Sequence, residues 1–182
     1  APAGGLWRSY DGGANWETNT DDFPTLGVSA IAFAPTDPTI VYIGTGDRDA
    51  SDSPGMGVMK SLDGGLTWEF ANSGISGYVV GDLAVHPANG DQVVASTSNG
   101  IFKTTDGGET WYQVSNNTQN YIDFAVHHTN PDIIYCTGQG RFWRSEDAGE
   151  DWEYINDGIV PSTRMVIAVT PAAPENVYVL SA

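Results

Sequence analysis

Three aspartates lie close together in one irregular stretch of the sequence. Asp47, Asp49 and Asp52 fall within residues 44–57, which also contain Arg48, four glycines and one proline. Carboxylate oxygens are hard ligands that suit Ca²⁺, so these aspartates are a candidate calcium site. Their spacing lacks the EF-hand pattern and its terminal glutamate. The alternative is a solvated acidic loop that binds no ion.

Two motifs recur along the chain. Four octapeptides carry aspartate at their third position and tryptophan at their eighth: Asp11 and Trp16, Asp63 and Trp68, Asp106 and Trp111, and Asp147 and Trp152. The aspartates are 52, 43 and 41 residues apart. Between the octapeptides lies a second motif, of which Leu83-Ala-Val-His-Pro87 is one copy. Two motifs that share one period identify a repeat protein.

Each repeat is expected to form four short antiparallel strands. Asp-Gly between β-prone runs predicts a hairpin, because left-handed positions tolerate these residues best. Four strands in a unit of 40 to 50 residues are typical of a β-propeller blade. The fold class is therefore all-β, a propeller or an arc of a larger one. The expected units are a half blade (1–22, third and fourth strands), three blades (23–73, 74–117 and 118–158), and a half blade (159–182, first and second strands).

The phase of the repeat leaves two arrangements open. The half blades at the two ends could pair with each other and close a four-bladed ring, the low limit of the architecture. Alternatively, the 182 residues are one arc of a larger propeller. We expect the second arrangement, in which further blades or domains belong to the same polypeptide.

The octapeptide resembles the Asp-box of the BNR-repeat propellers, a superfamily that includes sialidases, xyloglucan-degrading endoglucanases, sortilin-type receptors and photosystem assembly factors. The resemblance covers essentially the whole chain. It implies that each box lies between the third and fourth strands of a blade and that its carboxylate accepts hydrogen bonds from turn amides. The four aspartates and four tryptophans of the boxes are thus structural. The last box departs most from the pattern, with Ala148 in place of the first glycine.

The same resemblance provides a catalytic candidate. In the xyloglucan-degrading propellers a catalytic aspartate follows a strand similar to the one before Asp47. Glycoside hydrolysis normally needs two carboxylates, and in that family the second comes from a separate propeller that this chain does not contain. Sialidase activity is not expected, because nothing in the sequence places the three arginines outside the repeat positions, Arg48, Arg141 and Arg164, together.

Composition limits the partners. The net charge of −16 argues against nucleic acid or an anionic membrane surface as a partner, and no apolar run is long enough to span a bilayer. Strong acidity and few lysines favour an extracellular or cell-surface protein, and bacterial origin is expected from the resemblance. The lone Cys136 lies in an apolar run and is expected to be buried.

These observations predict a non-catalytic binding or scaffold segment of a larger secreted or cell-surface protein. Its ligand would be a protein or a glycan, held by the loop that carries Asp47, Arg48, Asp49 and Asp52. No cofactor is expected apart from the calcium ion considered above. The alternative is part of a glycoside hydrolase similar to the xyloglucan-degrading enzymes, with Asp47 as one of its two carboxylates.

Overall fold

The computed structural model describes residues 4–49, 52–162 and 164–181, and within these ranges the chain forms strands and no helix. The first half of the chain contains β1 (Trp7–Arg8), β2 (Glu17–Thr18), β3 (Val28–Ala34), β4 (Asp37–Thr45), β5 (Val58–Ser61), β6 (Glu69–Phe70), β7 (Val80–His86) and β8 (Asn89–Thr97). The second half contains β9 (Gly100–Thr104), β10 (Tyr112–Gln113), β11 (Asp123–Val126), β12 (Ile134–Gly138), β13 (Arg141–Ser145), β14 (Glu153–Ile155), β15 (Met165–Val169) and β16 (Val177–Ser181).

The strands form three complete blades and two smaller sheets. Strands β3–β6, β7–β10 and β11–β14 are four-stranded antiparallel sheets in which each strand pairs with the next in sequence. We refer to them as blades one, two and three. At the two ends of the chain, β1–β2 and β15–β16 are separate two-stranded sheets. The structure therefore confirms the predicted all-β fold of four-stranded propeller blades.

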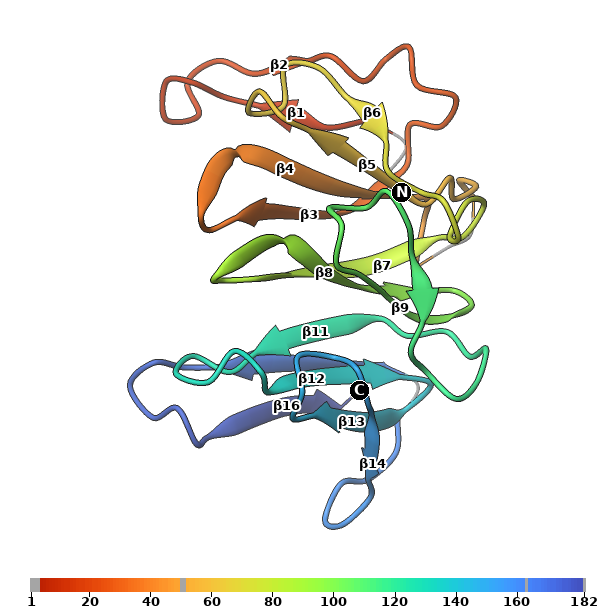
Figure 1. Ribbon diagram of the computed structural model, residues 1–182, viewed down its shortest axis with the longest axis vertical. Coiled ribbons are helices and arrows are strands. Elements are labelled where there is room, and N and C mark those ends of the chain that lie inside the picture. Colours follow the sequence, from red (N-terminus) through yellow and green to blue (C-terminus); the bar gives the residue numbers. More distant parts are fainter. Residues whose placement is uncertain (1–3, 50–51, 163, 182) are drawn as a thin grey trace.

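The sheet β1–β2 and blades one, two and three follow one another in chain order along the longest axis (Figure 1), and β15 packs against β11 and β12 of blade three. The first strands of neighbouring sheets lie next to one another, with β3 against β7, β7 against β11 and β11 against β15, as inner strands do around a propeller axis. Within the described ranges the sheet β1–β2 does not pair with β15–β16. The described residues thus form an open arc, and the pairing of the two half blades, one of the two arrangements that the sequence left open, is not seen among them.

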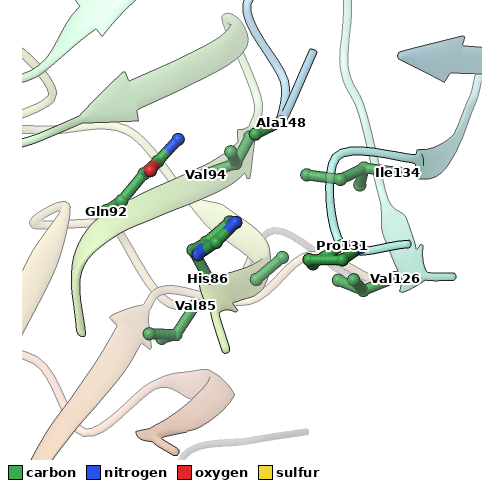
Figure 2. A pocket seen from close by; sticks show the side chains of 9 residues that line it. Val85, His86, Gln92, Val94, Val126, Pro131, Ile134 and Ala148 are labelled. Atoms are coloured by element: carbon green, nitrogen blue, oxygen red, sulfur yellow. The ribbon is translucent and has the colours of Figure 1, made fainter. Parts of the chain in front are cut away.

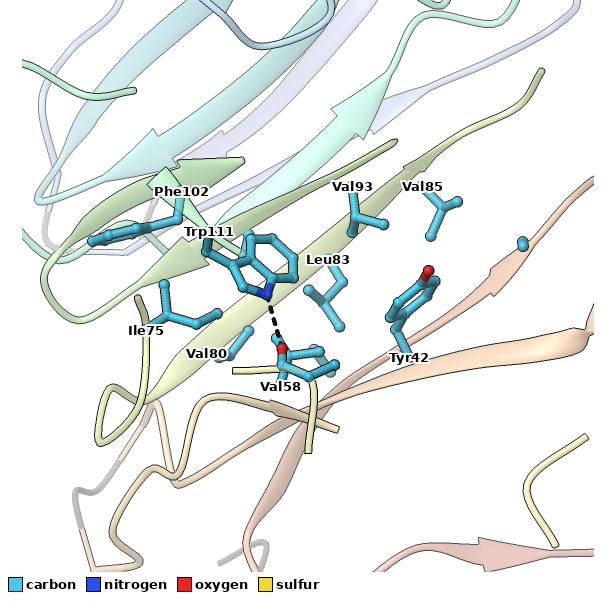
Figure 3. Packing of buried hydrophobic residues seen from close by; sticks show 13 residues of the cluster. Tyr42, Val58, Ile75, Val80, Leu83, Val85, Val93, Phe102 and Trp111 are labelled. Atoms are coloured by element: carbon cyan, nitrogen blue, oxygen red, sulfur yellow. Dashed lines mark hydrogen bonds between the residues drawn. The ribbon is translucent and has the colours of Figure 1, made fainter. Parts of the chain in front are cut away.

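Both faces of a blade are buried, and this explains the nearly continuous apolar strands. Neighbouring residues of a strand point to opposite faces. In β8, Val93 belongs to the apolar cluster between blades one and two, whereas Val94 belongs to the cluster between blades two and three. The first cluster includes the large buried side chains Tyr42, Phe102 and Trp111 (Figure 3). A third cluster joins blade three to β15–β16.

Blades two and three fit together with almost no free space. The cavity between them has a volume of about 10 Å³ and is lined by apolar side chains together with His86 and Gln92 (Figure 2). This is barely room for one water molecule. The His86 Nδ1 accepts a hydrogen bond from the Ala88 amide at 3.2 Å, so the imidazole stabilises the β7–β8 turn. Among the described residues, this cavity is therefore too small for a ligand and belongs to the packed core.

Candidate functional site

The Asp-box turns form in all four repeats, and their geometry is that of folding elements. In the second box, Asp63 Oδ1 accepts hydrogen bonds from the amides of Leu66 and Thr67, both at 2.9 Å, and Asp63 Oδ2 accepts one from the Thr67 hydroxyl at 2.6 Å. The hydroxyl of Ser61 also donates to this carboxylate. Every carboxylate oxygen is therefore already bonded within the turn, which leaves little capacity for a ligand or for catalysis.

The fourth box keeps this geometry although its sequence departs from the pattern. Ala148 adopts a φ of 56°, in the left-handed region that glycine occupies in the other three boxes. The Asp147 carboxylate still accepts the amides of Glu150 and Asp151. The turn therefore tolerates one strained alanine because the carboxylate bonds hold its backbone.

The irregular stretch between β4 and β5 is anchored to the blade rather than fully solvated. Asp47 is only 1% exposed, its amide donates to the Ser53 carbonyl, and its Oδ1 accepts the Asp49 amide at 2.8 Å. Ser53 is buried and shares a hydrogen bond with the Thr25 hydroxyl. Gly55 lies so close to the backbone of Tyr78 that a Cβ there would be 2.1 Å from its carbonyl oxygen. These contacts hold the described parts of the loop, up to Asp49 and from Asp52 onward, against the blades.

Asp52 is an acidic neighbour of Asp47 in this loop. Hydrogen bonding with Asp47 raises the pKa of Asp52, with burial and the nearby Asp47 charge acting in the same direction. The geometry of Asp47 fits a loop anchor, and its catalytic role stays a prediction.

The three aspartates do not fit a calcium site. Within the described ranges no group of three or more His, Cys, Asp or Glu side chains is placed to hold a metal ion. Asp47 is buried and bonded inside the loop, while Asp49 points to solvent with about half of its side chain exposed.

Arg48 reaches from the loop to the inner strands of the following blades. Its guanidinium donates to the carbonyl of Gly81, in β7, at 3.0 Å and to that of Ile122, just before β11, at 3.4 Å. Asp49 lies 3.9 Å from Arg48 and 3.6 Å from Arg164, which precedes β15. Arg48 and Asp49 of this loop thus form one cluster with Arg164, which is distant in sequence. We call it the axial cluster because it lies where the inner strands begin.

Two half-buried aspartates beside this cluster link the inner strands. Asp82 Oδ2 accepts the Phe124 amide, and Asp123 Oδ2 accepts the Ile167 amide, both at 2.9 Å, so each carboxylate joins its blade to the next. Burial raises the pKa of Asp82 to about 6, against the opposing effect of its two amide bonds. The Arg48 charge also lowers this pKa.

Sequence reasoning missed part of this arrangement. Asp82 and Asp123 each come directly before a copy of the second repeated motif, Leu83-Ala-Val and Phe124-Ala-Val. This shared position in the repeat could have pointed to a common role for the two aspartates. The sequence marks Arg164 only as an arginine outside the repeat positions and does not indicate that it lies near Arg48 and Asp49. Arg141, the third such arginine, does not join the axial cluster, since its guanidinium lies over the ring of Tyr154.

Repeated Asp-box turns on four-stranded antiparallel blades define the class as an Asp-box β-propeller. The model of the Sortilin-Vps10 family, described as "Sortilin, neurotensin receptor 3", matches residues 56–159. The chain therefore belongs to the Sortilin-Vps10 family. No curated protein sequence matches it.

Solved structures show the same fold at low sequence identity. A GH74 xyloglucanase from Xanthomonas campestris aligns with a TM-score of 0.69 and 20% identity over 90% of this chain and 29% of its own. The extracellular domain of a putative one component system from Bacteroides thetaiotaomicron has a TM-score of 0.73 and 12% identity, over 98% and 24%. YCF48 bound to D1 peptide has a TM-score of 0.55 and 16% identity, over 80% and 46%. The chain spans less than half of each.

Proposed function

We propose that this chain is a non-catalytic binding segment of a secreted or cell-surface propeller protein and that it holds a protein or glycan ligand at the axial cluster. The observation that carries the proposal is that Arg48 and Asp49 of one loop come together with Arg164 of another, while Asp47 is bonded within its own loop. Arg164 is 61% exposed, so its donors are accessible to a ligand. Loops on a rigid scaffold are where propellers and similar folds place binding residues.

The kind of ligand follows from the chemistry of this cluster. Guanidinium groups recognise carboxylates and carbonyl oxygens through paired donors, and Asp49 adds an acceptor for hydroxyl or amide groups. Such a mixed set suits a peptide or a sugar with several hydroxyl groups. The peptide bound by YCF48 and the glycan implied by the name xyloglucanase are examples of both ligand classes on related folds.

Arg164→Ala tests the proposal with little risk to folding, because the side chain is largely exposed. The probes are a glycan microarray and a library of random twelve-residue peptides. We expect a ligand from one of them whose affinity falls at least tenfold in Arg164→Ala, with an unchanged melting temperature. Arg141→Ala, outside the cluster, is the matched control and should bind normally. Absence of any ligand, or equal losses in both variants, would overturn the proposal.

A glycoside hydrolase segment is the second candidate, and the fold shared with a GH74 xyloglucanase favours it. It would use Asp47 as one carboxylate, with the other supplied from outside this chain. A reducing-sugar assay on xyloglucan with the full-length protein decides between the two. Hydrolysis that disappears in Asp47→Ala, with the fold retained, would replace the binding proposal by this one.

A further inference from the structure

A hollow lies on blade three, between the β12–β13 turn and the segment that leads from β14 toward β15. It has a volume of about 460 Å³ and is lined by Gln139, Gly140, Pro161 and Ser162. Ser162 comes two residues before Arg164, and the Ser162 hydroxyl donates to the Arg164 carbonyl at 3.4 Å. The hollow is therefore next to the segment that carries the exposed arginine of the axial cluster.

The turn that forms one wall of this hollow has a strained backbone. Gln139 has a φ of 50°, in the left-handed region that residues other than glycine rarely adopt. Among the described residues only Ala148 shares this feature, and Ala148 lies in an Asp-box. Such a conformation persists where the surrounding structure fixes it, and strained residues of this kind cluster at ligand sites.

The neighbouring segments fix the turn from both sides. A Cβ at Gly138 would lie 2.7 Å from the Asn120 carbonyl oxygen, and a Cβ at Gly140 would lie 2.3 Å from the Ser162 carbonyl oxygen. Because the backbone is in contact on both sides, the turn cannot relax easily around Gln139. The Gln139 side chain is nevertheless exposed, and in the described part of the chain no hydrogen bond engages its amide group. The turn thus presents a carboxamide at a fixed position.

The lining of the hollow suits a sugar ring. The Gln139 carboxamide has both donors and an acceptor, so it can bond to two neighbouring hydroxyl groups of a sugar. Pro161 adds an apolar surface for the face of the ring. Apolar surface combined with a few fixed polar groups is the usual character of a small-molecule site.

The charges near the hollow favour a ligand with a carboxylate. No acidic side chain of the described residues lines it, and residues 114–122 contain none, although the chain has 23 acidic residues. Arg164 is 61% exposed, and its one close acidic neighbour, Asp49 at 3.6 Å, leaves other guanidinium donors available. A guanidinium binds a carboxylate through two parallel hydrogen bonds, which makes Arg164 suited to an acidic substituent.

We propose that this hollow is a sugar subsite and that it binds the uronic acid residues of an acidic glycan, with the ring beside Gln139 and its carboxylate on Arg164. The inference rests on the proposed function, because it assumes a ligand at the axial cluster. It selects a glycan over a peptide and an acidic sugar over a neutral one. It also makes Gln139 a residue that determines specificity.

The first test compares acidic and neutral sugars by titration calorimetry of the natural sequence. The probes are tetramers of galacturonate, glucuronate and mannuronate, and the controls are the neutral tetramers of galactose, glucose and mannose. We expect at least one uronate tetramer to bind about tenfold more tightly than its neutral counterpart, because only the uronate pairs with Arg164. Equal affinity for the neutral sugar, or no binding of any uronate tetramer, would overturn the proposal.

The second test measures the role of Gln139 with the uronate tetramer that binds. Gln139→Ala should lower the affinity about fivefold through loss of the amide bonds and leave the melting temperature unchanged. Gln139→Gly should lower the affinity equally and raise the melting temperature, because glycine adopts the left-handed conformation without strain. Asn116→Ala, which removes an exposed carboxamide between β10 and β11, is the matched control and should bind normally.

The outcomes separate this inference from the proposed function on which it rests. A ligand whose affinity falls in Arg164→Ala but not in Gln139→Ala would overturn the sugar subsite and leave the axial cluster as the binding site. Affinity that is unaffected by either change would overturn both. Equal losses in Gln139→Ala and Asn116→Ala would also contradict the subsite, since they would show no preference for the hollow.

Discussion

Replacing Trp111 by alanine is expected to lower the free energy of unfolding by about 4 kcal/mol, since burying a smaller side chain at a closed core position leaves a cavity. Trp111 lies between blades one and two, in contact with the apolar cluster that contains Val58 and Ile75 (Figure 3). Its indole and its amide donate to the carbonyls of Ala71 and Ser73, both at 2.8 Å. The alanine variant loses the packing and leaves the Ala71 carbonyl without this donor.

Two further variants show which part of the interaction matters. Trp111→Phe retains most of the ring and loses only the indole donor, so we expect a loss of about 1–2 kcal/mol. Leu62→Ala removes an exposed side chain and should change stability by less than about 0.5 kcal/mol. Urea titration followed by fluorescence and circular dichroism provides the three values. A loss below about 1 kcal/mol in Trp111→Ala would contradict the view that Asp-box tryptophans join blades.

The contrast between Trp111 and Trp16 marks the limit of what the sequence could predict. Both tryptophans end the same octapeptide, so the repeat predicts the same turn for both, and both turns form. Their burial differs because, within the described residues, Trp111 packs against the preceding blade and Trp16 does not. The local sequence pattern therefore predicts the strands and turns, whereas the burial of a side chain depends on which blade packs against it.

The axial cluster was hidden from sequence reasoning for a related reason. Arg48 bonds to carbonyls 33 and 74 residues away, and those acceptors are main-chain atoms with no side-chain signature. The acidic loop was recognised as irregular, but the burial of Asp47 depends on Ser53 and on the approach of Gly55 to Tyr78. Such contacts arise only after the blades have stacked. The calcium hypothesis rested on spacing alone, and among the described residues the folded loop does not gather its three carboxylates around one point.

Stability is expected to be greatest near pH 4–5 and to fall steeply below about pH 3. Hydrogen bonds from the side chain four residues later, Asn15, Thr67 or Thr110, are the largest cause that lowers the pKa of the box aspartates Asp11, Asp63 and Asp106 to about 2. In the unfolded chain an aspartate titrates near 3.9. The folded state therefore binds fewer protons in this range, so the stabilisation is present above about pH 4 and disappears as the pH falls toward 2.

Asp82 produces the opposite limb of the pH–stability profile, in which stability falls as the pH rises. Burial raises its pKa to about 6, so the folded state binds more protons than the unfolded state between about pH 4 and 6. Its stabilising contribution is fully present below pH 4 and is lost as the pH rises through 6. A difference of two pKa units corresponds to a loss of at most about 3 kcal/mol in the free energy of unfolding. Repulsion within a chain of net charge −16 acts in the same direction.

Urea titrations at half-unit steps from pH 2 to 8 measure both limbs. Asp82→Asn should flatten the slope between pH 4 and 6 whatever its effect on absolute stability, because the titrating group is gone. Asp106→Asn should reduce the slope below pH 4 and leave the upper limb unchanged. The slopes, rather than the absolute values, separate titration from lost hydrogen bonds. A natural protein whose stability is constant between pH 4 and 6, or an Asp82→Asn variant with an unaltered slope, would show that the inner-strand carboxylate does not titrate in this range.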